Sequence, residues 1–246
     1  MSQQITTACL DMAGTTVADD GSVMTAFGAA VAEGGLLPGA PGYDQAIAYV
    51  QATMGQSKIE VFRAVLGGEE RAQRANSVFE SRYAESVRAG EVTPLPGAVE
   101  TIMALRAAGI KVCLATGFAP ATRDALLDAL GWRPIIDLAL SPADAGRGRP
   151  WPDMPLTALL RLGGGAVSEL VVVGDTASDV ESGLRAGAGL VAGVLTGAAS
   201  REALEQAAAP HILDSITGLL PLLGIGPVPV REIGRASCRE RVSSPV

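Results

Sequence analysis

Residues 5–16 read ITTACLDMAGTT, and this stretch decides how the rest of the chain is interpreted. The run from Ile5 to Leu10 is short and mostly apolar, and Asp11 follows it at once, which indicates a buried β-strand that ends in a carboxylate. The sequence MAGTT after it is made largely of small and hydroxyl residues and predicts a tight turn. A buried strand with a polar residue at its end is typical of parallel sheets, which bind ligands at the carboxyl ends of their strands.

From residue 98 onward the chain alternates between helical and strand-like segments. Together with the first strand, the predicted strands are 5–10, 110–115, 135–140, 170–173, 190–195 and 211–213. The predicted helices between them are 98–108, 120–130, 153–162, 177–186 and 200–208. Strands that alternate with helices of this length predict a parallel sheet with helices on both faces, so the predicted fold class is α/β.

One block of sequence interrupts this alternation. Its segments have helical spacing, separated by glycines and without a strand signal, at 23–33, 43–53, 57–66 and 69–88. We therefore expect an α/β core domain built from residues 1–17 and 92–230, with an α-helical insertion at 18–91.

The end of the chain, residues 231–246, differs abruptly from what precedes it. Residues 232–242 read EIGRASCRERV, have no apolar period and are similar to the translated read-through of a sequencing adapter. We predict a non-native tail and exclude it from the fold. A genuine disordered basic tail is the alternative.

Composition narrows the classes of function. The chain is 48% apolar and carries a formal net charge of −7, so it lacks the basic surface that nucleic-acid binding requires. No run reaches the roughly 18 apolar residues of a membrane span, and the N-terminus lacks the basic region of a signal peptide. The three cysteines suggest neither a disulfide framework nor a zinc site, and we expect a cytoplasmic protein.

Polar residues follow several of the predicted strands. They are Asp11 after the first strand, Thr116-Gly117 after the second, Arg149 after 135–140, and Asp175 with Asp179 after 170–173. Neighbouring carboxylates repel unless a cation sits between them, and oxygen ligands suit a hard ion such as Mg²⁺. Magnesium beside an arginine suits a phosphoryl group, and an ionised Asp can attack phosphorus.

These residues resemble the four motifs of the haloacid dehalogenase (HAD) superfamily. The motifs are matched by DMAGTT at Asp11–Thr16, Thr116-Gly117, Arg149 before a proline, and GDTASD at Gly174–Asp179, in the family's order and spacing. The resemblance covers about residues 5–220. It implies a Rossmannoid parallel sheet, and it identifies the helical insertion as the family's first-type cap.

The resemblance also implies a role for each matched residue. Asp11 is expected to be the nucleophile and a Mg²⁺ ligand, with the Ala13 carbonyl and Asp175 as further ligands and Asp179 as a ligand or an outer support. Thr116 and Arg149 are expected to hold the phosphoryl oxygens. The other expected substrate-binding residues are Gly14, Thr15, Met54 and Gly117.

Ala13 points to one branch of the superfamily. Most HAD phosphatases have at this position an Asp that protonates the departing oxygen, and alanine cannot do so. The chain resembles the phosphonatases (phosphonoacetaldehyde hydrolases) and their relatives in three stretches, which are Asp11–Thr16, Met54-Gly55-Gln56-Ser57-Lys58 and Gly148–Met154. In that family the lysine forms an imine with the substrate aldehyde, so that cleavage of the C–P bond leaves an enamine rather than a carbanion.

Lys58 is one of only two lysines among 19 basic residues, the other being Lys111. Arginine cannot replace an imine-forming lysine, because it has no neutral amine that attacks a carbonyl. We therefore expect Lys58 to be catalytic, while a solvated helix position is the structural alternative.

The chain also departs from the phosphonatase pattern. Val61 stands where that family has His, Phe118 where it has Tyr, and Ser22 or Gly21 where it has Cys. Hydrolysis of a phosphonoacetaldehyde-like C–P bond is the favoured function. The alternatives are a phosphate monoesterase of the phosphoglycolate-phosphatase type and a non-catalytic metabolite-binding relic. The expected partner is a small organophosphorus substrate, without nucleic acid or membrane, and the sequence leaves a homodimer open.

Overall fold

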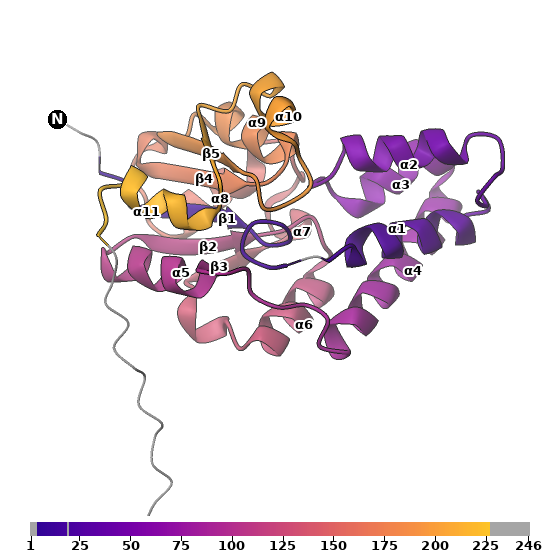
Figure 1. Ribbon diagram of the computed structural model, residues 1–246, viewed down its shortest axis with the longest axis horizontal. Coiled ribbons are helices and arrows are strands. Elements are labelled where there is room, and N and C mark those ends of the chain that lie inside the picture. Colours follow the sequence, from indigo (N-terminus) through magenta and orange to yellow (C-terminus); the bar gives the residue numbers. More distant parts are fainter. Residues whose placement is uncertain (1–3, 19, 227–246) are drawn as a thin grey trace, which may run out of the picture.

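A computed structural model describes residues 4–18 and 20–226 and contains one six-stranded parallel sheet (Figure 1). The order of the strands across the sheet is β3-β2-β1-β4-β5-β6. Their bounds are β1 Thr7–Asp11, β2 Lys111–Ala115, β3 Leu138–Leu140, β4 Leu170–Gly174, β5 Leu190–Val194 and β6 His211–Leu213. The α/β class predicted from the alternation is confirmed. The predicted tail at 231–246 lies outside the described residues.

The register of the sheet brings the ends of three strands together. In β1, Thr7 pairs with Lys111 of β2 and with Leu170 of β4, and Asp11 pairs with Ala115. All these strands run in the same direction, so their carboxyl ends meet at one edge of the sheet. Asp11 therefore lies at the centre of that edge.

Helices cover both faces of the sheet, as the apolar character of the strands requires. Their bounds are α5 Ala98–Ala107, α6 Pro120–Leu130, α7 Pro142–Ala145, α8 Asp153–Arg161, α9 Ala177–Ala186, α10 Arg201–Gln206 and α11 Leu219–Leu222. Successive strand residues point to opposite faces. Leu10 and Leu114 belong to the cluster that includes residues of α5 and α6, whereas Cys9 and Cys113 belong to the cluster that includes residues of α8.

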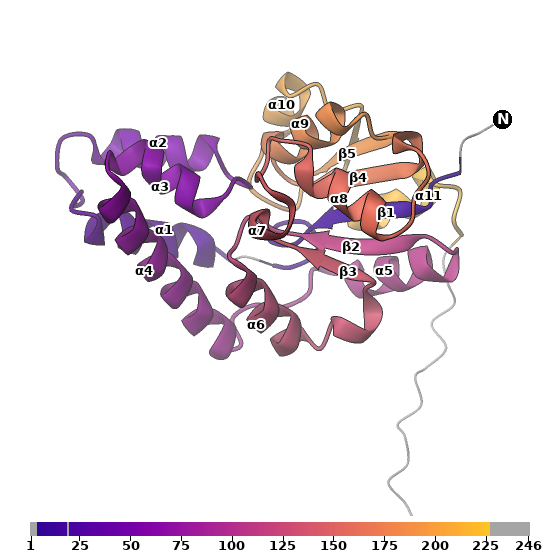
Figure 2. The same ribbon diagram turned by 180° about the vertical axis from the view of Figure 1, so that it is seen from behind.

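Four inserted helices lie beyond the carboxyl edge of the sheet, to one side of the core (Figures 1 and 2). They are α1 Ser22–Glu33, α2 Tyr43–Ala52, α3 Lys58–Leu66 and α4 Glu69–Arg88. Phe79 of α4 is the centre of their packing, since its ring lies 4.7 Å from Phe27 and 6.1 Å from Phe62 between centroids. Aromatic residues are only 4% of the chain, and several of them are concentrated here.

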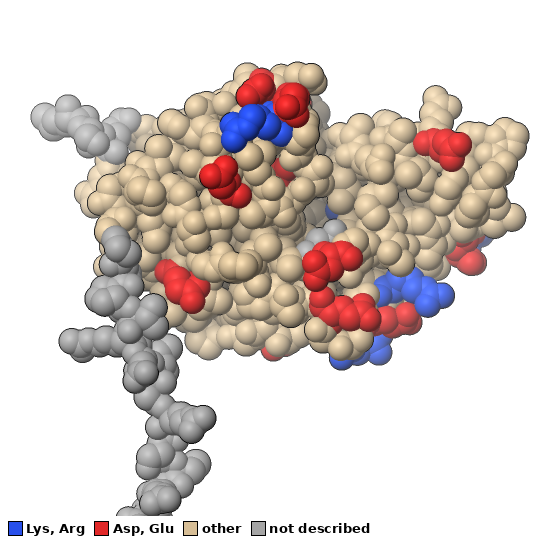
Figure 3. All heavy atoms as spheres, in the orientation of Figure 1, with Lys and Arg blue, Asp and Glu red and all other residues tan. Residues whose placement is uncertain are grey.

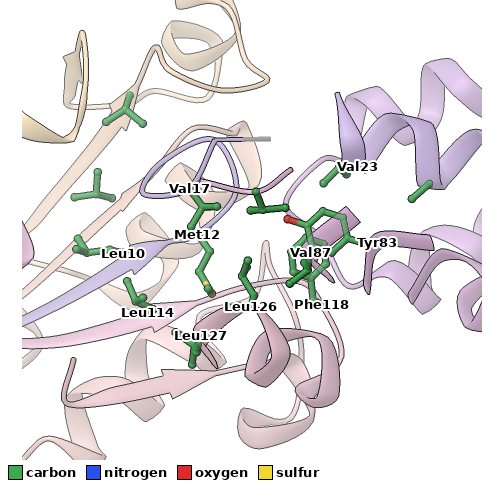
Figure 4. Close-up of a cluster of buried hydrophobic side chains, with 14 of the residues drawn as sticks. Leu10, Met12, Val17, Val23, Tyr83, Val87, Leu114, Phe118, Leu126 and Leu127 are labelled. Carbon is green, nitrogen blue, oxygen red and sulfur yellow. The ribbon is translucent and has the colours of Figure 1, made fainter. Parts of the chain in front are cut away.

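The apolar core continues from the sheet into the inserted helices. Figure 4 shows Leu10 and Met12 on the sheet side of this cluster, and Tyr83 with Phe118 on the side of the insertion. The rings of Tyr83 and Phe118 are 4.4 Å apart between centroids and join α4 to the loop after β2. Because the sheet core and the inserted helices pack against each other here, residues from both of them surround the space at the carboxyl edge of the sheet.

Most predicted elements are present, but one strand is shorter than predicted. Of the predicted strand 135–140, only Leu138–Leu140 pairs with β2, and Arg133–Ile135 forms a 3₁₀ turn. The turn explains the difference, because the amide of Ile135 donates to the carbonyl of Trp132 at 3.0 Å and is not available to the sheet, while Pro134 favours the turn by fixing its own φ. The short helices α7 and α11 were not predicted. Among the described residues, no helix is both long and apolar enough to cross a membrane.

The central strands are expected to dominate stability. Replacing the fully buried Leu114 with alanine should lower the free energy of unfolding by about 2–5 kcal/mol, because it leaves a cavity against the packed helices. Urea unfolding followed by circular dichroism measures this. Leu160→Ala on α8, where the side chain is 75% exposed, is the matched control and should change stability by less than about 0.5 kcal/mol. Equal losses in the two variants would contradict this view of the core.

Candidate active site

A tight turn directly after β1 builds the first part of the site. The amides of Thr15, Thr16 and Val17 all donate to the carbonyl of Met12, and the hydroxyl of Thr16 donates to the carbonyl of Asp11 at 2.9 Å. These bonds close the chain around Met12 and hold Asp11 at the strand end. The turn predicted from MAGTT is confirmed.

Gly14 is required in this turn for two reasons. Its φ of +86° is a conformation that L-residues with side chains rarely adopt. A Cβ at this position would also lie 2.5 Å from Oδ2 of Asp175, closer than real contacts allow. The turn after β1 and the carboxylate after β4 therefore fit together only with glycine at residue 14.

Three carboxylates gather at the sheet edge. Asp11, Asp175 and Asp179 each offer an oxygen, and these atoms all lie within 4.8 Å of one another. All three side chains are buried. Burial raises the pKa of Asp175 to about 6, and the charge of Asp179 adds to the effect. Burial also raises the pKa of Asp11 well above its usual range, while the charge of Arg149 opposes the shift.

Arg149 is the counter-charge within this cluster. Its Nη1 lies 2.7 Å from Oδ1 of Asp11, and its Nε lies 2.7 Å from Oδ1 of Asp179. Its Nη2 donates to the carbonyl of Ala115 at 3.0 Å, and Nη1 also donates to the carbonyl of Gly55 at 3.3 Å. The guanidinium thus ties together two carboxylates, the end of β2 and the loop before α3. Its contact with phosphoryl oxygens stays a prediction.

Asp179 is held at both carboxylate oxygens. Oδ1 pairs with Arg149, and Oδ2 accepts the amide of Thr176 at 3.1 Å and also its hydroxyl. In return the hydroxyl of Thr176 accepts the amide of Asp179, which makes a capping box at the start of α9. Of the two roles expected for Asp179, this geometry favours support of the site over direct metal binding.

Asp175 is fixed by neutral donors. Its Oδ2 accepts the amide of Ala198 at 2.7 Å, and its Oδ1 accepts the hydroxyl of Thr15 at 3.2 Å. Thr15, expected to help bind the phosphoryl group, contacts Asp175 through its side chain instead. Asp175 has no cationic partner of its own in these bonds.

The residues at this edge fit a magnesium ion. Hard divalent cations prefer oxygen ligands, and Asp11 and Asp175 offer buried carboxylate oxygens whose mutual repulsion a cation would relieve. Ala13 lines the same cavity as these two residues, and the role of its carbonyl as a ligand stays a prediction. Of the four predicted metal ligands, Asp11, Ala13 and Asp175 line this cavity, while Asp179 pairs with Arg149.

A cavity of about 580 Å³ joins the sheet edge to the inserted helices. The predicted site residues that line it are Asp11, Ala13, Gly14, Met54, Lys58, Thr116, Gly117, Arg149 and Asp175. Gly117 permits the close approach of the two parts, since a Cβ there would lie 2.4 Å from the carbonyl oxygen of Gln56. On the face seen in Figure 3, basic residues lie in small groups beside acidic ones and form no continuous basic surface.

Lys58 brings an amine into this cavity from the insertion. It is the first residue of α3, and its side chain is buried. Its Nζ lies 5.3, 5.8 and 5.2 Å from the ring centroids of Phe27, Phe79 and Phe118. The alternative of a solvated helix position is therefore wrong.

Comparison with known proteins fits this arrangement. The family model of the haloacid dehalogenase-like hydrolases matches residues 5–187. The chain belongs to this family of hydrolases. Among curated relatives, the phosphonoacetaldehyde hydrolase of Bordetella pertussis is 32% identical over 153 residues, which is 53% of this chain and 55% of that protein. That of Salmonella typhimurium is 40% identical over 98 residues, 39% of this chain and 36% of that protein. The chain thus matches about half or less of the length of these relatives.

Two solved structures are similar over nearly the whole fold. A hydrolase from Pseudomonas syringae has a TM-score of 0.77 at 25% identity, covering 89% of this chain and 98% of that one. A phosphonoacetaldehyde hydrolase-like protein from Oleispira antarctica has a TM-score of 0.77 at 26% identity, covering 91% and 92%. The resemblance to the phosphonatase branch, seen first in the motifs, is confirmed.

Several residues around this HAD site were not predicted from the sequence. Phe27 and Phe79, which flank Lys58, occupy apolar helix positions that look like ordinary core. Thr196, whose hydroxyl donates to the carbonyl of Gly14 at 2.7 Å, lies in a loop without a motif. Glu80 reaches from α4 to the core at Thr122. Only the three-dimensional packing shows these neighbours.

The fit between Gly14 and Asp175 leads to a metal-binding prediction. Gly14→Ala should lower Mg²⁺ affinity by about tenfold to a hundredfold, because the new methyl group displaces the Asp175 carboxylate. Isothermal titration calorimetry with Mg²⁺ measures this. Gly109→Ala is the matched control, since Gly109 has a similar φ of +83° with open space around it. If both variants bind Mg²⁺ equally well, the contact is not important for the site.

The raised pKa of Asp175 predicts how pH and metal act together. Its pKa of about 6 exceeds the unfolded value of 3.8, so the stability it contributes is full below pH 3.8 and is lost as pH rises through 6. Mg²⁺ should restore stability only where Asp175 is ionised. At about a hundred times its Kd, we expect Mg²⁺ to raise Tm by about 5–10 °C at pH 7.5 and by clearly less at pH 5.

Differential scanning fluorimetry at the two pH values measures this shift. Asp175→Asn, which keeps the shape but not the charge, should show little shift at either pH. A shift of the same size at pH 5 and pH 7.5 in the unaltered protein would contradict the assignment of Asp175 as a ligand.

Proposed function

We propose that this HAD hydrolase cleaves the C–P bond of a phosphonoacetaldehyde-like substrate, with Asp11 as nucleophile and Lys58 as imine-forming amine. The observation that carries the proposal is that Lys58, from the inserted helices, and Asp11, from the sheet edge, line one cavity. The names of the curated relatives support the same substrate class.

The surroundings of Lys58 suit an amine that must lose its proton. Burial among Phe27, Phe79 and Phe118 removes water and so disfavours the ammonium form. Once an imine forms, the same ring faces attract its positive charge. The site thus permits both the neutral amine that attacks and the cation that accepts electrons.

The reaction balances with one water consumed overall. The Lys58 amine adds to the substrate carbonyl, and loss of water gives a protonated imine. The Asp11 carboxylate attacks phosphorus, the C–P bond breaks, and its electron pair moves onto carbon to form an enamine. The enamine takes up a proton at carbon, and water hydrolyses the resulting imine to release the aldehyde and Lys58. A second water hydrolyses the aspartyl-phosphate to phosphate and Asp11.

The other residues of the edge bind and orient the substrate. Magnesium, when bound by Asp11, Asp175 and the Ala13 carbonyl, supplies positive charge that offsets the negative charge of the phosphoryl group. Thr116, which lines the same cavity, is the residue proposed to contact phosphoryl oxygens, because the amides of Gly14 and Thr15 donate to the carbonyls of Val17 and Met12 within the turn. Arg149 opposes the rise in the pKa of Asp11 through its ion pair and orients the carboxylate. The inserted helices act as a cap that limits water around the imine.

Ala13 fits a carbon leaving group better than an oxygen one. In ester hydrolysis the departing oxygen needs a proton, and alanine cannot supply it. In C–P cleavage the electrons leave through the imine nitrogen, so no acid at residue 13 is needed. This contrast favours the phosphonate over a monoester such as phosphoglycolate.

Trapping with borohydride tests the proposal. Protein incubated with phosphonoacetaldehyde and borohydride should gain a mass adduct on Lys58, because borohydride reduces an imine to a stable secondary amine. Lys58→Arg should lose the adduct and lower the release of phosphate and acetaldehyde by about a hundredfold or more. Lys111→Arg is the matched control and should behave like the unaltered protein, since Lys111 lies exposed beside Asp137.

Two outcomes would overturn the proposal. If no adduct forms while Lys58→Arg hydrolyses phosphoglycolate as fast as the unaltered protein, the protein is a monoesterase in which Lys58 at most binds an anion. If neither substrate is turned over with Mg²⁺ present, the remaining interpretation is a non-catalytic metabolite-binding protein.

A further inference from the structure

Glu80 connects the inserted helices to the core at a point beside Lys58. It lies on α4, and its Oε1 accepts the amide of Ala119 at 3.2 Å, while its Oε2 accepts the hydroxyl of Thr122. Ala119 is the N-cap residue of α6 and has no side-chain acceptor for the free amides of that helix. Glu80 supplies this acceptor, and its negative charge is favourable at a helix N-terminus.

The same carboxylate belongs to the surroundings of Lys58. Glu80 and Lys58 both line a second cavity of about 630 Å³, which shares Lys58, Phe118 and Arg149 with the first. Glu80 follows Phe79 in the chain, and its partner Ala119 follows Phe118, so both residues are tied to rings that lie against the Lys58 amine. Burial raises the pKa of Glu80, and the charge of Lys58 acts in the opposite direction.

Other charged groups face the same space. Those that line the second cavity are Glu60, Arg147 and Arg149, and those that line the first are Asp11, Asp20, Arg149 and Asp175. Asp11 is paired with Arg149, and the side chain of Glu60 is 61% exposed and paired with Arg63. Exposure to water screens Glu60, so its effect on Lys58 should be weak. Glu80 is half-buried and held in place by core donors.

We propose that Glu80 is a positioning residue that sets the charge of Lys58, because its fixed carboxylate stabilises the cationic forms of that amine and its bond to Ala119 holds the ring of Phe118 in place. The inference extends the proposed function, since a protonated imine at Lys58 would be stabilised in the same way. Its test follows the Lys58 amine itself and needs no substrate.

A counter-charge at this point adds to the effect of the ring faces. A protonated imine must be cationic when it accepts the electrons of the C–P bond, and ring faces stabilise a buried cation only modestly. Glu80 lines the second cavity together with Lys58 but not the cavity that contains Asp11, so it favours the cation without occupying the position of the substrate.

Chemical labelling of the two lysines tests this inference. The metal-free protein is treated with trace acetic anhydride over a range of pH, and acetylation of Lys58 and Lys111 is quantified by peptide mass spectrometry. Glu80→Gln removes the charge and keeps one oxygen that can accept the amide of Ala119, while its NH₂ group can donate to the hydroxyl of Thr122. It should lower the pKa of Lys58 by about half a unit to one unit, so that Lys58 is labelled about threefold to tenfold faster at neutral pH. Lys111 is the internal standard and should not change.

Two further variants separate charge from structure. Glu60→Gln makes the same chemical change at the exposed carboxylate of the same cavity and should leave the labelling profile of Lys58 within about 0.2 pH units of the unaltered protein. Thr122→Val removes one hydrogen bond but leaves the charge, and it should shift the profile less than Glu80→Gln does. Thermal unfolding of each variant verifies that it is folded.

The inference is overturned if Glu80→Gln leaves the Lys58 profile unchanged, or shifts it no more than Glu60→Gln or Thr122→Val does. These outcomes are separate from failure of the proposed function. A shifted Lys58 profile combined with no borohydride adduct would refute the imine and retain the effect of Glu80 on the amine. A borohydride adduct combined with an unshifted Lys58 profile would support the imine and refute the effect of Glu80 on the amine.

Discussion

The whole site depends on keeping three buried carboxylates within 4.8 Å of one another. Burial and repulsion by neighbouring carboxylates disfavour the ionised forms of Asp11 and Asp175, and a buried charge is tolerated only when paired and hydrogen-bonded. Arg149 meets part of this requirement by pairing with Asp11 and Asp179 at 2.7 Å each. Asp175 is left with neutral donors, and this imbalance is what a bound divalent cation would compensate. A metal held by Asp11 and Asp175 would share only Asp11 with the arginine.

The two parts of the chain meet through polar as well as apolar contacts. The rings of Tyr83 and Phe118 pack across the boundary, while Arg149 reaches the carbonyl of Gly55 and Glu80 reaches α6. Hydrogen bonds of this kind can be exchanged for bonds to water at modest cost, whereas a wholly apolar boundary resists separation. A boundary of mixed character suits a site that must admit substrate and then exclude water.

Sequence patterns predicted the parts of the site that stand at strand ends and missed the parts that depend on packing. Asp11, Asp175 and Arg149 follow buried strands, and the geometry of a parallel sheet brings such positions together without further information. The environment of Lys58 was not predictable, because Phe79 and Glu80 occupy a helix whose spacing reveals a buried face but not its partner. The strand predicted at 135–140 failed at its start for a local reason, because Ile135 belongs to a 3₁₀ turn and its amide donates to the carbonyl of Trp132.

Two positions in one cavity decide which bond the site is suited to break. Ala13 lies at the carboxyl edge of the sheet, where an oxygen leaving group would need a proton, and the alanine side chain cannot donate one. Lys58 stands across the cavity, where a carbon leaving group would need an acceptor for its electrons, and an amine can become one. Hydrolysis of an ester would need an acid at Ala13, which is chemically inert. It would not need the amine of Lys58, which is buried at some cost in free energy. A phosphonate with a neighbouring carbonyl reverses both conditions, so alanine at residue 13 and the buried amine of Lys58 both fit the proposed C–P cleavage.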